Sequence, residues 1–129
     1  AKLVIELKKG NGITEKILQI IKKNKIQDNV IIVSFHSSYI KKIKKHNPKI
    51  KTALLSIRPL LIIERAKLCN ADLIGIYYRF LNKKLIDKIH KHNLKIFAYE
   101  GVKENLNKNK IKKLIKLGLD GMALNNPIL

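Results

Sequence analysis

The sequence contains little cysteine, no tryptophan and few acidic residues, and each scarcity narrows the classes of protein that fit. The single cysteine, Cys69, excludes a disulfide within the chain and suits the reducing cytoplasm, where we expect this protein. No apolar run approaches the roughly 18 residues of a membrane-spanning helix, and no secretory signal is recognisable in the first residues. Because 46% of the 129 residues are hydrophobic, the chain can bury a core, and we expect one domain over residues 1–129.

Acidic residues are outnumbered: 9 Asp and Glu stand against 28 Lys and Arg, which gives a formal net charge of +19. Such a charge suits a basic nucleic-acid-binding domain, and we keep that function as an alternative. Two observations favour a weaker, non-specific attraction to polyanions. Arginine, whose planar fork reads bases and phosphates, occurs only as Arg58, Arg65 and Arg79. The lysines are spread over all the predicted helices instead of forming one stripe.

Apolar runs rich in β-branched residues alternate with segments whose apolar residues recur at helical spacing. This alternation is typical of parallel strands joined by crossover helices, so we expect an α/β fold with six strands in sequential order and helices on one face. Strands are predicted at 3–8, 29–35, 51–57, 72–77, 94–99 and 121–124.

Helices are predicted between these strands, and cap residues mark several of their ends. Ser37 or Ser38 can cap one helix, Asn82 can cap another, and Asn93 and Gly118 can end two of them. The predicted helices cover 14–24, the segment from the serine cap to before Pro48, 61–69, the segment carrying Leu85, Ile86 and Ile89, and the segment carrying Ile111, Leu114 and Ile115.

The first predicted strand ends in two charged residues on one face. Side chains alternate along a strand, so Glu6 and Lys8 point the same way while Leu7 points to the other side. A carboxylate is a ligand for a divalent cation, and an ammonium binds a phosphate oxygen. The pair therefore predicts a metal and phosphate site, unless it is an ordinary strand end that meets solvent.

The motifs of the chain, in their order and spacing, resemble those of the glycerophosphodiester phosphodiesterase family. The resemblance covers nearly the whole sequence and rests on five passages. They are Glu6-Leu7-Lys8, SFHSSYIKKIKKHNP at 34–48 with TALL at 52–55, NADLIG at 70–75, LKIFAY at 94–99, and GLDGM at 118–122 with Pro127.

This resemblance implies a TIM-type barrel that cleaves glycerol-phosphate diesters with a divalent metal, Mg²⁺ or Ca²⁺. Glu6 matches a metal ligand of the family and Lys8 matches its phosphate contact. The family's His-Arg-Gly, Glu-x-Asp and His-Asp motifs, which include its acid and base histidines, do not occur here. The resemblance thus implies six of eight barrel strands, a partial barrel. We expect this chain to be half of a split enzyme. An amino-terminal partner chain, or failing that a second copy of this chain, would complete the barrel.

Further candidate residues follow the ends of later strands, where a barrel carries its site. His36, after the second strand, is a candidate catalytic acid or base, and Glu100, after the fifth, is a candidate second metal ligand. Ser34 has no base partner in the sequence, so nucleophilic serine chemistry has little support. The sequence predicts that His36 converges with Glu6, Lys8, Arg58 and Tyr99 at the carboxyl end of the sheet.

Substrate contacts are predicted at the same edge. Arg58 and Arg79 stand after the third and fourth strands, where a guanidinium fork could hold a phosphate. Tyr99 could form an aromatic wall for a glycerol or head group. The family's terminal Thr-Asp-x-Pro motif reads Leu124-Asn125-Asn126-Pro127 here, so Asn125 keeps hydrogen bonding but lacks the charge.

Three functions therefore remain open. The first is metal-dependent hydrolysis of a small, phospholipid-derived phosphodiester, with little or no turnover by this chain alone. The second is a non-catalytic relative that binds phosphate or a partner. The third is the basic nucleic-acid-binding domain.

Overall fold

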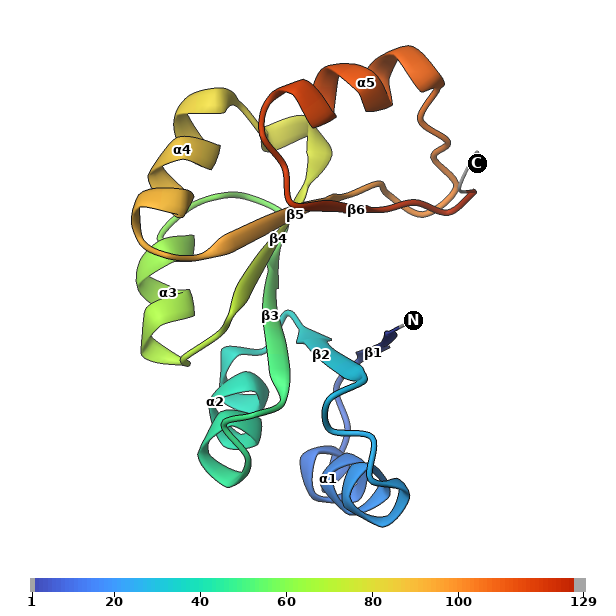
Figure 1. The fold of residues 1–129 in the computed structure, drawn as a ribbon, viewed down its shortest axis with the longest axis vertical. Coiled ribbons are helices and arrows are strands. Elements are labelled where there is room, and N and C mark those ends of the chain that lie inside the picture. Colours follow the sequence, from blue (N-terminus) through green and yellow to red (C-terminus); the bar gives the residue numbers. More distant parts are fainter. Residues whose placement is uncertain (1, 127–129) are drawn as a thin grey trace. The chain divides into compact units, whose positions relative to one another are not determined.

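The computed structural model describes residues 2–126 and contains six parallel strands in the order β1-β2-β3-β4-β5-β6 (Figure 1). Five α-helices and one 3₁₀ turn, η1, connect them, so strand and helix alternate from β1 to β6. The predicted α/β fold class, a partial TIM-type barrel with sequential strands, is confirmed. The elements are β1 (Leu3–Glu6), α1 (Ile13–Asn24), β2 (Val30–Ser34), α2 (Ser37–His46), β3 (Lys51–Ser56), α3 (Ile62–Leu68), β4 (Leu73–Tyr77), η1 (Tyr78–Phe80), α4 (Lys83–Lys91), β5 (Lys95–Tyr99), α5 (Lys108–Lys116) and β6 (Gly121–Ala123).

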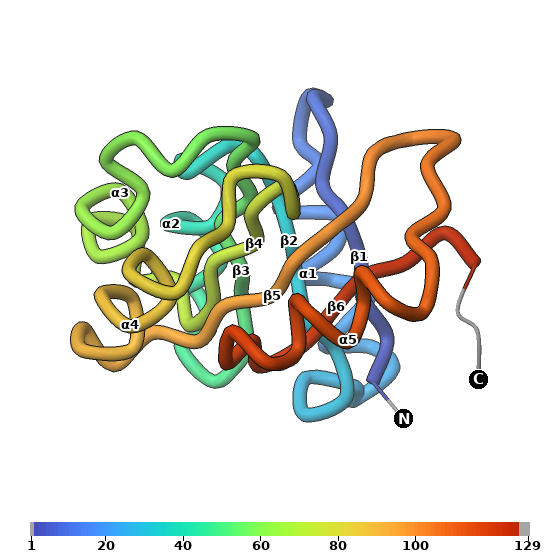
Figure 2. Tube along the Cα trace, turned by 90° about the horizontal axis from the view of Figure 1, so that it is seen from above, coloured from blue at the N-terminus to red at the C-terminus, as the bar shows by residue number. Residues whose placement is uncertain are grey.

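These elements belong to two compact units, and each unit can be followed along the chain in Figure 2. The first unit contains the residues up to Leu55 together with Glu64–Leu73, and the second contains Ser56–Ile63 and the residues from Ile74 onward. The prediction of one domain stays a prediction. No helix within residues 2–126 is long and apolar enough to cross a bilayer.

Isoleucine fills the interior of both units. Its β-branched side chain suits strands, and its stiffness limits the entropy lost on burial. In the first unit β1 and β2 pair from Leu3 with Val30 to Glu6 with Val33. The largest fully buried side chains are Ile21, Ile32, Ile40, Ile43, Ile50 and Leu54 in the first unit, and Ile62, Ile74, Ile76, Ile86, Ile89 and Ile96 in the second.

An aspartate binds the start of β3 in the first unit. The backbone N–H of Thr52 and the ammonium of Lys44 both donate to Asp72 Oδ2, each at 2.9 Å. The N–H of Asp72 donates in return to the carbonyl of Thr52 at 3.0 Å. The carboxylate and its own backbone thus hold the second residue of β3 at two points.

The second unit repeats this arrangement. Ile96 N–H donates to Asp120 Oδ2 at 2.9 Å, and the N–H of Asp120 donates to the carbonyl of Ile96 at 2.9 Å. His90 Nε2 lies 2.8 Å from the same carboxylate oxygen. In each unit, therefore, an aspartate before one strand binds the second residue of the strand before it.

The structure confirms the predicted helix caps at Asn82 and Asn93 and contradicts the one at the start of α2. The side chain of Asn82 accepts a hydrogen bond from Leu85 N–H, and Asn93 adopts a left-handed backbone (φ 57°), as predicted. The predicted serine cap of α2 is wrong, because His36 occupies the N-cap position and Ser37 is already helical. The sequence also did not predict η1, and the strands are one or two residues shorter than predicted at several ends.

Candidate functional site

The end of β1 holds Glu6 and Lys8 on either side of a fixed residue. Leu7 is buried, with 3% of its surface exposed, and its N–H donates to the carbonyl of Val33 at 2.8 Å. Its carbonyl accepts a hydrogen bond from Ser34 Oγ at 2.7 Å. Because Leu7 is bound at both backbone groups, its neighbours Glu6 and Lys8 have a defined backbone from which their side chains reach solvent.

Ser34 links this strand end to His36. Its buried hydroxyl donates to the carbonyl of Leu7 and accepts from the N–H of His36 at 3.1 Å. Both hydrogen-bonding roles of the hydroxyl are therefore used. The structure makes Ser34 a positioning residue, a role that the sequence indicated only through a lone serine at the end of an apolar strand.

His36 lies on the same edge of the first unit as the connection that follows Lys8. The imidazole of His36 is exposed, and its centroid is 5.1 Å from the ring of Tyr39. The Tyr39 hydroxyl accepts from Gly10 N–H at 3.3 Å and lies 3.4 Å from the carbonyl of Gly10, to which it donates. The structure thus brings the segments of Glu6, Lys8 and His36 together, while the catalytic role of His36 stays a prediction.

The charged groups of Glu6 and Lys8 are available to a ligand. No hydrogen bond or ion pair among the described residues 2–126 involves either side chain. A divalent cation such as Ca²⁺ takes six to eight oxygen ligands. No group of three or more His, Cys, Asp or Glu side chains able to hold a metal occurs in the described part of the chain. Glu6 therefore fits a metal as one ligand of an incomplete set.

Arg58 and Tyr99 are tied to each other's segments in the second unit. The Tyr99 hydroxyl donates to the carbonyl of Ser56 at 3.0 Å, and Ser56 Oγ donates to the carbonyl of Arg58 at 2.6 Å. The exposed guanidinium of Arg58 lies 6.0 Å from the ring centroid of Phe80. Arg58 is thus held beside the end of β5 with its fork open, although the union of these residues with Glu6 and Lys8 in one site stays a prediction.

Glu100 organises the connection after β5. It is 7% exposed, and its Oε2 accepts from Leu106 N–H at 2.9 Å while its Oε1 accepts from Asn125 N–H. The Asn125 amide donates to the carbonyls of Gly101 and Glu104, at 2.8 and 2.9 Å. An aspartate at 125 could not donate these two bonds, so the neutral residue suits its place. Metal binding by Glu100 stays a prediction.

Glu104 is the centre of a cluster that the sequence did not predict. Its carboxylate accepts from the Tyr77 hydroxyl at 2.8 Å, from Gly101 N–H at 2.8 Å and from Arg79 Nη2 at 3.1 Å. Arg79 Nε also donates to the Tyr77 hydroxyl at 3.0 Å. The guanidinium of Arg79 is thus partly engaged within the protein, whereas no described carboxylate pairs with Arg58.

Acid should weaken the Glu104 cluster. The hydrogen bond from the Tyr77 hydroxyl, followed by that from Gly101 N–H, lowers the pKa of Glu104. A carboxyl with a lowered folded-state pKa contributes its full stability above the unfolded value of about 4.3 and loses it as the pH falls through the folded value. We expect the melting temperature of Glu104→Gln to fall less than that of the wild type between roughly pH 5 and pH 3. Glu64→Gln, at an exposed glutamate, is the matched control and should follow the wild type.

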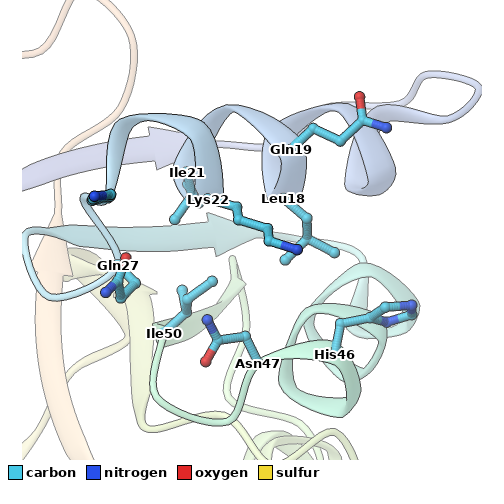
Figure 3. Close-up of a pocket in the computed structure, with 9 residues that line it drawn as sticks. Leu18, Gln19, Ile21, Lys22, Gln27, His46, Asn47 and Ile50 are labelled. Carbon is cyan, nitrogen blue, oxygen red and sulfur yellow. The ribbon is translucent and has the colours of Figure 1, made fainter.

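A cavity of about 590 Å³ lies on the other edge of the first unit (Figure 3). Gln27 and Ile50 belong to the connections that lead into β2 and β3, so the cavity is at the amino end of the strands and Glu6 is at the carboxyl end. Lys22 and His46 stand in the last turns of α1 and α2, where cations complement the helix dipoles. Their charge has this structural explanation, and we do not assign the cavity to the candidate site.

Sequential parallel strands with connecting helices, and open charged groups around the carboxyl end of β1, define a partial barrel of the TIM type. The family model of the "Glycerophosphoryl diester phosphodiesterase family" matches residues 4–129. The chain therefore belongs to this family.

A curated relative is similar to this chain in sequence, and two solved structures are similar to it in fold. The chain is 28% identical to a "Glycerophosphodiester phosphodiesterase" of Caldanaerobacter subterraneus subsp. tengcongensis over 95% of its own length and 51% of the relative's. A crystal structure of a candidate glycerophosphodiester phosphodiesterase from Galdieria sulphuraria matches with a TM-score of 0.87 and 23% identity, over 98% of this chain and 54% of that one. A phosphodiesterase of Oleispira antarctica, in complex with the product sn-glycerol-3-phosphate, matches with a TM-score of 0.79 and 22% identity, over 94% and 50%. The chain thus spans about half the length of these proteins.

Proposed function

We propose that this chain takes part in the metal-dependent hydrolysis of glycerol-phosphate diesters. One observation carries the proposal: Glu6 and Lys8, which match the family's Glu-x-Lys motif, leave their charged groups open on either side of a backbone fixed at Leu7. If these two charges served only stability, we would expect them to form an ion pair with each other. An open carboxylate and an open ammonium instead suit a ligand that brings both a cation and a phosphate.

The first unit contributes charge to the phosphate in this proposal. The Lys8 ammonium binds a non-bridging phosphate oxygen and stabilises the negative charge that grows in the transition state. Glu6 supplies one oxygen to a Mg²⁺ or Ca²⁺ ion, which as a Lewis acid would polarise the phosphoryl group when bound. His36, exposed on the same edge, donates a proton to the substrate or accepts one from it.

The second unit contributes substrate contacts. The open fork of Arg58 suits bidentate binding of a phosphate. The ring of Tyr99, whose centroid lies 6.0 Å from that of Tyr77, offers an apolar wall to the glycerol or head group. Because the hydroxyl of Tyr99 is held by Ser56, the orientation of this ring is fixed before a ligand arrives.

Completion of the site by further polypeptide is also part of the proposal. The family's His-Arg-Gly and His-Asp motifs do not occur in this sequence, and loss of an acid or base group typically costs about 10²–10⁴-fold in rate. The chain also spans only about half of its relatives. We infer that a polypeptide carrying those histidines, such as a separate amino-terminal chain, joins this one.

Hydrolysis of glycerophosphodiesters tests the proposal directly. The purified protein is assayed with Mg²⁺, Mn²⁺ or Ca²⁺, alone and mixed with a polypeptide that carries the family's histidine motifs. We expect a rate gain of at least about 10²-fold on mixing, because a missing acid or base is restored. Equal rates with and without the added polypeptide would contradict a split enzyme. Phosphate binding without turnover in any mixture would favour the non-catalytic alternative.

Metal binding by Glu6 has its own test. By calorimetry we expect weak binding of Ca²⁺ or Mg²⁺ to the protein alone, with a dissociation constant on the order of 1 mM, because one carboxylate is a small part of a cation's ligand set. Glu6→Gln should abolish the heat. Glu64→Gln, which changes an exposed glutamate on α3, should not change it. Tight binding that survives Glu6→Gln would move the metal to another site.

A further inference from the structure

Two turns of the second unit expose apolar side chains at their tips. The first, Pro59–Ile62, follows β3 and is closed by a hydrogen bond from Ile62 N–H to the carbonyl of Pro59 at 3.3 Å. The second, Gly101–Glu104, follows β5 and is closed by Glu104 N–H and the carbonyl of Gly101 at 3.1 Å. The side chains at their first central positions, Leu60 and Val102, are 75% and 89% exposed. Figure 2 shows these connections in green and in orange.

The backbone of both turns is unfavourable for the residues that occupy it. Leu61 and Lys103, the second central residues, adopt left-handed conformations with φ of 51° and 66°. Glycine or asparagine normally fills such positions, because other side chains are strained there. The other non-glycine residues with positive φ in the described chain, Lys25, Asn70 and Asn93, follow the ends of helices, where this conformation is an ordinary cap.

Both turns therefore carry a strained residue next to an exposed apolar one. Leu61 is itself 61% exposed, so neither burial nor packing explains why a leucine is present. An apolar tip on a strained turn is a poor choice for stability and solubility alone. Observed backbone strain of this kind points to a function for the segment.

The two turns lie at the same edge of the sheet. They follow β3 and β5, and η1 follows β4, which lies between those two strands. The Tyr99 hydroxyl also joins the end of β5 to Ser56, three residues before the first turn, and Arg58 lies over the ring of Phe80 in η1. The exposed apolar residues of these three connections, which we call the loop patch, are Ile57, Leu60, Leu61, Phe80 and Val102.

The unpaired charges of the loop patch are positive. Arg58 and Lys103 adjoin its apolar residues, and both are exposed. The carboxylates of the same connections are already satisfied: Glu100 is buried and bonded to backbone N–H groups, and Glu104 is paired with Arg79. An apolar surface bordered by cations is complementary to an anionic lipid surface, in which acyl chains lie beneath negative head groups.

We propose that the loop patch docks on the surface of an anionic phospholipid bilayer, with Leu60, Leu61 and Val102 entering the boundary between head groups and acyl chains. The turns are short and held at both ends, so little chain entropy is lost when they enter. Lys103 then pairs with a lipid phosphate at the level of the head groups. This inference concerns binding to a surface and does not depend on hydrolysis by the protein.

Sedimentation with lipid vesicles tests the inference. The purified protein is mixed with vesicles of phosphatidylcholine containing phosphatidylglycerol in about 0.5 M salt, where charges more than a few ångströms apart are screened and the net charge of +19 contributes little. We expect Leu60→Ser to lower the partition coefficient about tenfold, since it removes most of one inserted apolar side chain. Leu68→Ser is the matched control, because Leu68 is 76% exposed and lies on α3.

Other results would overturn the inference. Equal losses in Leu60→Ser and Leu68→Ser, or none in either, would mean that the loop patch is not the docking surface. Val102→Ser with Ile115→Ser as its control repeats the comparison at a second turn and guards against a folding defect, which circular dichroism monitors. If light scattering instead shows that Leu60→Ser dissociates a dimer while vesicle binding is unchanged, the patch is an interface between protein chains and the lipid assignment is wrong.

Discussion

Replacing Lys8 with alanine should lower kcat/KM for glycerophosphodiester hydrolysis by about 10²–10³-fold in the completed enzyme, the loss typical of one preorganised donor to a developing oxyanion. The reason is that the ammonium of Lys8 has no described partner within the protein and is available to the phosphate. The loss should appear mainly in kcat, since charge builds up on the phosphate in the transition state.

Lys9→Ala is the matched control for this prediction. Lys9 is the next residue, likewise exposed and of the same charge, but it does not match the family's Glu-x-Lys motif. Its replacement should leave kcat/KM nearly unchanged. If both variants lose activity equally, the lysines act through general attraction of the anionic substrate, and the match of Lys8 to the family motif has no mechanistic meaning.

Ser34→Ala should lower the free energy of unfolding by about 1–3 kcal/mol, because it leaves one buried and one partly buried backbone group without a partner. These groups are the carbonyl of Leu7 and the N–H of His36. Chemical denaturation followed by circular dichroism measures the loss. The same variant should also loosen Glu6 and Lys8, so hydrolysis should fall even under conditions in which the variant is fully folded.

Ser38→Ala provides the comparison. Ser38 is exposed near the start of α2 and its side chain has no hydrogen bond among the described residues, so its replacement should change the free energy of unfolding little. A Ser34→Ala protein as stable as Ser38→Ala would mean that solvent reaches the gap and satisfies both groups. Ser34 would then be a core residue of small consequence instead of a link between strand end and histidine.

The order of strands and helices was predictable because it depends on local patterns. Runs such as Val30–Ser34 and the caps at Asn82 and Asn93 contain within a few residues the information that defines them. The serine cap of α2 failed for a tertiary reason. Ser34, two residues before the N-cap, donates to Leu7 and accepts from His36 N–H, so the backbone enters the helix one residue earlier than a serine cap would require.

The site was predictable only in part. Glu6 and Lys8 stood out because a strand end shows its alternation in the sequence. The Glu104 cluster did not, since Tyr77 and Glu104 are 27 residues apart and nothing local indicates that they meet. The paired state of Arg79 depends on that same long-range contact, since Arg79 bonds to both residues. A sequence shows which residues can form such a bond, but the packing of the connections decides which of them do.

The two aspartates before β4 and β6 have a consequence for how the chain avoids misfolding. Strands that consist largely of isoleucine and its relatives offer similar apolar contacts when one strand slides past another, so the core alone distinguishes poorly between a correct and a shifted pairing. A shift would take Asp72 away from Thr52, and Asp120 away from Ile96, and would leave charged groups facing apolar side chains. These two carboxylates therefore specify the strand register. A chain with few acidic residues uses two of them to select one alignment among several that the core alone would tolerate.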